Sequence, residues 1–155
     1  MSASPPSSRG QKRGGRAQQR REARCCALQL LYSYDQKHYE DDGLLVPEDH
    51  FAAAPTETSD YAHELFNGYR TERAAIDAII DERLNNWTLA RLAVIDRSLL
   101  RLGTYELIYC DQTPMKVIIN EYIELAKQYG SEGKTAKLIN GVLDRIAREF
   151  RKQGG

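Results

Sequence analysis

Residues 16–34 read RAQQRREARCCALQLLYSY, and the spacing of the apolar side chains in this stretch predicts a helix. Its apolar face consists of Ala23, Ala27, Leu30, Leu31 and Tyr34. At about 100° per residue, Arg16, Arg20 and Arg24 fall along that same face. We therefore predict that the first turns extend past the edge of the core, where solvent-facing guanidinium groups are free to bind phosphate.

The opposite face of this helix carries a second line, formed by Arg21, Cys25, Leu28 and Tyr32. Two interpretations stay open for the apolar members of the line. Leu28 and Tyr32 either contact another helix of the same domain or form a patch for a protein partner.

The 155-residue chain has 22 acidic and 22 basic residues, but the charge is unevenly distributed. Residues 1–24 contain seven basic side chains and one acidic side chain, so this segment has a net charge of +6 and the remainder −6. Such a basic arm favours a polyanionic partner, although a merely solubilising tail is the alternative. Residues 1–15 have almost no apolar side chains, and Gly14 and Gly15 delay the helix to about Arg16. The predicted organisation is a disordered basic tail over 1–15 and a single helical domain over 16–155.

The rest of the chain repeats the helical spacing and shows no strand pattern. Residues 37–57 are predicted to be a long connection, with a short helix near 44–46 or around Phe51. Further helices are predicted from Ser59 or Asp60 to Asn85 with a break near Gly68 to Thr71, from Thr88 to about Cys110, and from Thr113-Pro114 to Gly130. After a short polar loop, a final helix is predicted, whose apolar face consists of Ile139, Val142, Leu143, Ile146 and Phe150. The fold class is therefore all-α, with about six or seven helices.

Composition and spacing argue against several functional classes. No apolar run approaches the roughly 18 residues that span a bilayer, and the basic N-terminus lacks the apolar segment of a secretory signal. The three cysteines have no metal-binding spacing and indicate reduced thiols in the cytoplasm. His38, His50 and His63 are scattered, and no nucleophile has a recognisable base nearby. We therefore expect no catalytic residue, no metal and no cofactor.

The stretch from Gly130 to Thr135 resembles a phosphate-binding P-loop only superficially. Two residues separate its first glycine from Gly-Lys, where the motif needs four, and a helix precedes it instead of a strand. Lys134 and Lys137, next to the start of a helix, can still bind one backbone phosphate. An ordinary turn between two helices is an equally good interpretation of this loop.

Two further features favour a structural role. Glu106 projects onto the apolar face of its helix, and we interpret it as a structural ion pair or helix-end acceptor instead of a catalytic acid. Trp87 and most tyrosines lie on or beside apolar faces, which favours the core over base stacking, with Tyr32 as the exception.

Several stretches together resemble the NusB family. The sequence RREAR at 20–24, followed by ALQLLY at 27–32, resembles the first helix of that family. The stretch DRSLLRLGTYEL at 96–107 resembles its central helix, and NEYIELAK at 120–127 with INGVLD at 139–144 resembles its last two helices. The matches cover roughly residues 16–150 in the family's order, and the paired C-terminal motifs are the most specific.

The resemblance implies two small helical bundles that pack together, and it implies no catalysed reaction. It also implies transcription antitermination: with NusE, a small-subunit ribosomal protein, the chain would bind a boxA-type single-stranded RNA element in nascent ribosomal RNA. The complex would load that RNA onto elongating RNA polymerase in the cytoplasm and oppose termination, so contact with polymerase is indirect. Some family members form homodimers that cover these surfaces, and the sequence leaves this open.

Site residues follow from the same resemblance. The arginine-rich start of the first helix matches Arg20, Arg21 and Arg24, with Arg16 one turn earlier, although Glu22 interrupts the run. The loop before the last helix, Ser131 to Lys137, also approaches RNA in the family, and this places Lys134 and Lys137 in the RNA site. The NusE surface matches Tyr32 and Asp96.

Two alternatives to this function stay open at this point. The chain is either a NusB-like RNA-binding domain of an rRNA cytosine methyltransferase, or an adaptor that binds only proteins. Because the sequence stops at Gly155, without a methyltransferase fold or its cofactor loop, we expect the first alternative to fail.

Overall fold

The computed structural model describes residues 7–36 and 56–151, and all of the regular structure within them is helical. The elements are α1 (Ser7–Gln36), α2 (Thr56–Thr71), α3 (Arg73–Asp81), the 3₁₀ turn η2 (Leu89–Arg91), α4 (Val94–Tyr109), α5 (Met115–Tyr129) and α6 (Thr135–Phe150). The all-α prediction is confirmed. The short helix predicted near 44–46 or Phe51 lies outside the described residues.

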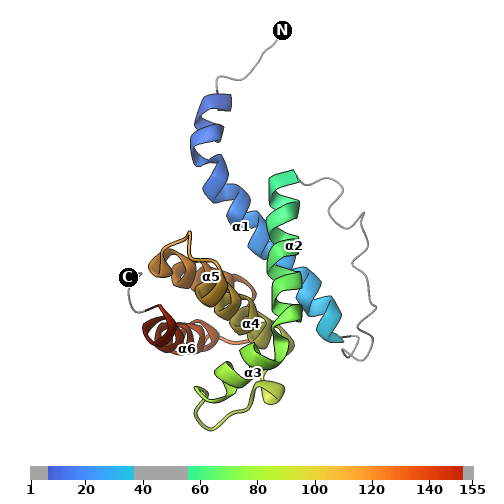
Figure 1. Ribbon diagram of the computed structural model, residues 1–155, viewed down its shortest axis with the longest axis vertical. Coiled ribbons are helices and arrows are strands. Elements are labelled where there is room, and N and C mark those ends of the chain that lie inside the picture. Colours follow the sequence, from blue (N-terminus) through green and yellow to red (C-terminus); the bar gives the residue numbers. More distant parts are fainter. Residues whose placement is uncertain (1–6, 37–55, 152–155) are drawn as a thin grey trace.

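Helix α4 lies at the centre of the fold and separates two groups of helices (Figure 1). On one side α1 packs along α2, which leads into α3, and on the other side α5 packs along α6. Because α4 contacts all five of these helices, it joins the two groups into one body. This arrangement confirms the two packed small bundles implied by the family resemblance.

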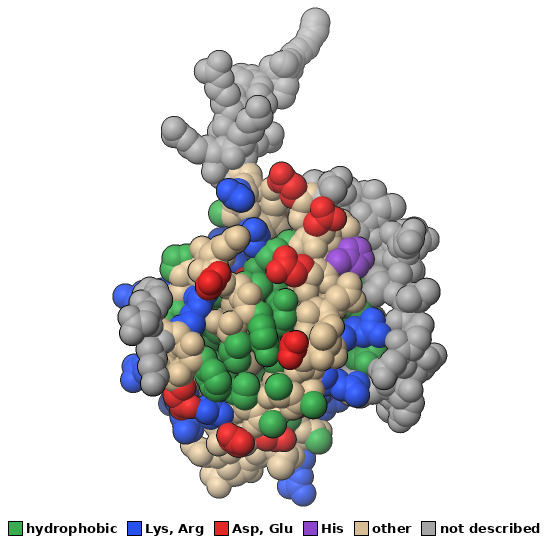
Figure 2. Space-filling model, in the orientation of Figure 1, with side chains coloured by type: hydrophobic (Ala, Val, Ile, Leu, Met, Phe, Trp, Pro, Cys, Tyr) green, Lys and Arg blue, Asp and Glu red, His purple; other side chains and the backbone are tan. Residues whose placement is uncertain are grey.

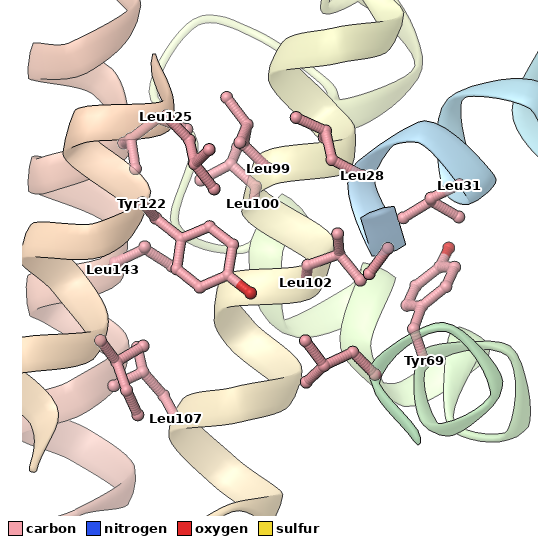
Figure 3. Close-up of a cluster of buried hydrophobic side chains, with 14 of the residues drawn as sticks. Leu28, Leu31, Tyr69, Leu99, Leu100, Leu102, Leu107, Tyr122, Leu125 and Leu143 are labelled. Atoms are coloured by element: carbon pink, nitrogen blue, oxygen red, sulfur yellow. The ribbon is translucent and has the colours of Figure 1, made fainter. Parts of the chain in front are cut away.

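The hydrophobic core surrounds α4 because leucines cover more than one side of that helix. Leu99, Leu100, Leu102 and Leu107 are all fully buried, and a helix that is apolar around most of its circumference must be buried in this way. Figure 3 shows them between Leu28 and Leu31 of α1 and the side chains of α5 and α6. Each fully buried leucine stabilises the fold by about 1.5–3 kcal/mol.

The beginnings of three helices differ from the prediction. Helix α1 begins at Ser7 instead of about Arg16, because glycines inside a helix cost only about 1 kcal/mol each and do not by themselves end it. The predicted helix start near Arg16 is therefore wrong, while the predicted disorder of the tail over residues 1–15 stays a prediction. Helix α2 begins at Thr56, a few residues before the predicted cap at Ser59 or Asp60.

The predicted start of the central helix at Thr88 is also wrong. The Thr88 hydroxyl makes no capping hydrogen bond, and the Leu89 amide donates to the Asp81 carboxylate at 2.7 Å. This bond holds η2 as a separate turn, and an extended backbone at Leu92 follows it, so α4 starts only at Val94.

The predicted break near Gly68 is confirmed, since α2 ends at Thr71 and α3 begins at Arg73. A Cβ atom at Gly68 would lie 2.1 Å from Cζ of Tyr105. The missing side chain therefore lets α4 approach α2 closely at this point. Gly130 follows the last residue of α5 and ends that helix as predicted.

Candidate nucleic-acid interface

The three arginines on the leading face of α1 change from exposed to buried along the helix. Arg16 is exposed, and the guanidinium group of Arg20 lies 3.7 Å from the centre of the Tyr61 ring. Arg24, one turn further on, is only 2% exposed. The first turns of α1 project beyond the other helices (Figure 1). In the space-filling view of Figure 2, Lys or Arg side chains lie where this projection leaves the body.

Arg24 belongs to a buried network that connects four helices. Its Nε and Nη2 donate to the two oxygens of Glu106 at 2.7 and 2.8 Å. The hydroxyls of Tyr61 and Tyr122 donate to the same carboxylate at 2.6 and 2.7 Å. The prediction that Arg24 faces solvent is therefore wrong, because its fork is fully used by a carboxylate inside the core. The structural interpretation of Glu106 is confirmed.

The charges of this network determine its protonation. Burial disfavours the charged form of Arg24, but the hydrogen bonds and the negative charge of Glu106 outweigh that effect and raise the pKa of Arg24. Burial and the Glu106 charge both raise the pKa of Tyr61 and of Tyr122, which keeps the two hydroxyls protonated as donors. Arg24 is thus always positively charged, and its charge neutralises the buried Glu106 carboxylate.

Arg21 lies on the other side of α1 and is accessible. Its side chain is 56% exposed, and its Nε and Nη2 donate to Glu121 of α5 at 3.1 and 3.0 Å. Because such an exposed ion pair contributes little to stability, a phosphate can replace the carboxylate at small cost. Among the side chains that the structure describes, three arginines bring a cation to the surface at this end of the helix. They are Arg16, Arg20 and Arg21, and we call them the α1 rim.

The loop between α5 and α6 places Lys134 and Lys137 at the surface, as predicted. The backbone amide and hydroxyl of Ser131 donate to Asp96 at 3.1 and 2.6 Å, and the Thr135 hydroxyl donates at 3.2 Å. Asp96 is buried under this loop, so the prediction that it lies on a partner surface is wrong. Its carboxylate instead fixes the lysine-bearing loop to the start of α4.

The second line of α1 separates into a buried and an exposed part. Leu28 is buried in the core, whereas Tyr32 is 40% exposed.

Trp87 is 55% exposed, so its predicted place in the core is wrong: it precedes η2 in a turn that the core does not cover. Cys25, Cys26 and Cys110 are free thiols.

Sequence reasoning missed the partners of the arginines. Tyr61 under Arg20 and Glu121 beside Arg21 come from α2 and α5, far away in the sequence. The buried pair did leave a signal, because Arg24 and Glu106 each fall on an apolar helix face, where an unpaired charge would be very costly.

The model of the NusB family matches residues 21–148. The chain belongs to the NusB family. A Listeria welshimeri protein named transcription antitermination protein NusB is 44% identical over 132 residues, which cover 84% of this chain and 97% of that protein. This NusB-family chain also carries Arg16 and Arg20 just before the matched region, so two of the three arginines at the exposed end of α1 precede the match.

Solved structures share the NusB-family fold. A structure of T. maritima NusB has a TM-score of 0.75 and 33% identity, and it covers 87% of this chain and 95% of that chain. A structure of the antitermination factors NusB and NusE in complex with dsRNA has a TM-score of 0.71 and 28% identity. The match covers 86% of this chain and 98% of the chain in that structure.

Among the described residues, none of the helices is both long enough and apolar enough to cross a membrane. The same part of the chain brings together no group of three potential metal ligands among histidine, cysteine and acidic side chains.

Proposed function

We propose that this protein is a transcription antitermination factor that acts as a non-catalytic RNA-binding scaffold together with a NusE-type ribosomal protein. The observation that carries the proposal is the α1 rim, where exposed cations stand on a helix that projects from the body. Membership of the family supports it, as do the relatives' name and the solved NusB–NusE complex with dsRNA. This name favours antitermination over the methyltransferase-domain alternative.

The RNA would meet two groups of cations. The α1 rim offers guanidinium groups that bind phosphate as flat forks, and Lys134 and Lys137 offer ammonium groups beside the start of α6. Single-stranded RNA of the boxA type suits such a track, since phosphate contacts position the strand and leave its bases to be recognised separately. The finer proposal is that this RNA lies in nascent ribosomal transcripts, where the complex suppresses termination.

A partner of the NusE type would contact the exposed part of α1 around Tyr32. Gln29 and Ser33 flank this ring on the same helix and are also exposed. Tyrosine is enriched among the residues that dominate binding energy at interfaces, because its ring is large and rigid. Asp96 is not part of this surface, because it is buried under the loop between α5 and α6.

The RNA site is tested by the salt dependence of RNA binding. Labelled boxA-type RNA is titrated with the unmodified protein and with the variant Arg16→Ala plus Arg20→Ala. Each lost phosphate contact lowers the slope of log affinity against log salt by about 0.7, so we expect a loss of about 1.4 in the double variant. Arg91→Ala plus Arg148→Ala removes two other exposed arginines and should leave the slope unchanged.

The partner is tested in the same titration with NusE added. We expect NusE to tighten RNA binding, and Tyr32→Ala to remove most of this gain. Trp87→Ala, which removes an exposed aromatic ring elsewhere, is the control. Binding of NusE without any salt-sensitive RNA binding would contradict the scaffold and favour an adaptor that binds only proteins.

A further inference from the structure

A polar cavity opens next to the α1 rim. It has a volume of about 150 Å³ and is lined by residues of three helices and of the loop from α4 to α5. The lining includes Arg20 of α1, Tyr61 and Glu64 of α2, Tyr109 of α4, and Asp111 and Gln112 of the loop. Its space suits one flat ring system, and Arg20 belongs to both the rim and the cavity.

The charges of the cavity exclude a phosphate as its occupant. Glu64 and Asp111 contribute two carboxylates against the single guanidinium of Arg20. A backbone phosphate would therefore be repelled from the interior and stay on the rim. A group that presents hydrogen-bond donors would be attracted instead.

One of these carboxylates is available to a ligand. Glu64 accepts a weak hydrogen bond from the Cys110 thiol at 3.7 Å. Asp111 is exposed, and within the described part of the chain it forms no ion pair or hydrogen bond. Its two oxygens can therefore accept a pair of parallel donors from a molecule that enters the cavity.

The cavity also offers a flat surface. The Tyr109 ring is 43% exposed, and one of its faces stacks on Tyr105, with ring centres 5.1 Å apart and planes at 23°. The other face can extend this stack to a base, as aromatic side chains do in proteins that bind single-stranded RNA.

We propose that this cavity binds one unpaired guanine of the RNA, stacked on Tyr109 and held at its Watson–Crick edge by Asp111. Guanine is the base with two adjacent donors on that edge, the ring N1–H and the exocyclic amino group, which match the two oxygens of one carboxylate. Adenine and cytosine present an amino donor beside an acceptor, which a carboxylate cannot pair with in this way. The inference rests on the proposed function, since the rim is what would bring the strand to the cavity.

The test compares short oligouridines that carry a single central guanosine, inosine or adenosine. Inosine lacks the exocyclic amino group and so removes one of the two donors. We expect the guanosine strand to bind about tenfold more tightly than either of the others, the difference of a good bidentate contact. Asp111→Asn should abolish this preference. Asp60→Asn removes the same charge from an exposed position beside Tyr61, outside the cavity, and should retain the preference.

The salt slope separates this inference from the proposed function. We expect Asp111→Asn to change the guanosine preference but not the slope. Equal binding of the three strands by the unmodified protein would overturn the guanine site and leave the proposed function intact, provided that the slope remains steep. Retention of the preference in Asp111→Asn would likewise overturn the site. Failure to bind any strand at low salt would overturn both.

Discussion

The two ends of the arginine line on α1 differ in what surrounds them, although the residues are identical in type. At the outer end, Arg16 faces solvent and Arg20 rests on Tyr61. One turn further, Arg24 is enclosed by Glu106, Tyr61 and Tyr122. The same side chain thus acts as a surface cation at one position and as an internal support at the other. The position of the core edge along α1 decides between these roles.

The largest effect is expected where the buried end of the line is broken. Arg24→Ala leaves the Glu106 carboxylate buried without its counter-charge, so we expect a loss of about 3–5 kcal/mol in the free energy of unfolding. Urea unfolding measures this loss. Arg24→Met combined with Glu106→Gln removes both charges and keeps an acceptor for the tyrosine hydroxyls, and it should recover a large part of the stability. A loss below 1 kcal/mol in Arg24→Ala would contradict the structural role.

A smaller loss of stability is expected when the buried carboxylate of Asp96 is removed. Asp96→Ala removes the acceptor of three hydrogen bonds and should lower the free energy of unfolding by about 1–3 kcal/mol. Hydrogen exchange at the Ser131 amide should accelerate, because the loop is released from α4. Asp144→Ala, at a more exposed acid on α6, is the control and should cost less than 1 kcal/mol. Unchanged stability with a lost NusE contact would restore Asp96 to a partner surface.

High pH should lower the free energy of unfolding, because a thiol that is buried near the Arg24–Glu106 pair loses its proton more easily in the unfolded chain. Burial, followed by the charges of Glu106 and Glu64, raises the pKa of the Cys110 thiol from 9.0 to about 12. The folded protein therefore keeps this proton when the unfolded chain has lost it. The resulting stability is complete below pH 9 and is lost as the pH rises towards 12, at about 1.4 kcal/mol for each pH unit between these limits.

Urea unfolding over this pH range measures the loss. We expect the free energy of unfolding of Cys110→Ala to decrease less steeply with rising pH than that of the unmodified protein. Part of the decrease should remain, because the pKa values of Tyr61 and Tyr122 are also raised in the folded protein. Parallel curves for the two proteins would show that the thiol does not contribute.

The smallest effect on stability is expected at Arg21, on the exposed side. Arg21→Ala should change the free energy of unfolding by less than about 1 kcal/mol, since its ion pair with Glu121 is largely solvated. RNA affinity should nevertheless fall, by the equivalent of one phosphate contact. Glu121→Ala breaks the same pair but keeps the cation, so RNA affinity should stay equal or rise. A drop in affinity in both variants would mean that the pair itself shapes the site.

The fold was largely predictable because helical periodicity is a local property of the sequence. Leu99 and Leu102 fall on one face of their helix whatever surrounds them, and the all-α fold follows from such patterns. The helix starts were less predictable. The separation of η2 from α4 depends on the Asp81 carboxylate, which reaches Leu89 from the preceding helix.

The site was predictable as a surface but not residue by residue. Periodicity placed Arg16, Arg20 and Arg24 in one line, yet it could not say where the core ends along it. Exposure of Arg16 was correctly predicted, and burial of Arg24 and Asp96 was not. Both errors concern charges whose partners, Glu106 and Ser131, come from distant segments. A charge on an apolar helix face should therefore be interpreted first as a candidate for a buried pair.

The central claim is that RNA meets the outer arginines and not Arg24. The most direct test is the salt slope of RNA binding in the variant Arg24→Met plus Glu106→Gln, measured beside Arg16→Ala plus Arg20→Ala. We predict the slope of the unmodified protein for the first variant and a slope lower by about 1.4 for the second. A decrease in the first variant, with the second unchanged, would show that Arg24 leaves Glu106 to bind RNA and would contradict the account.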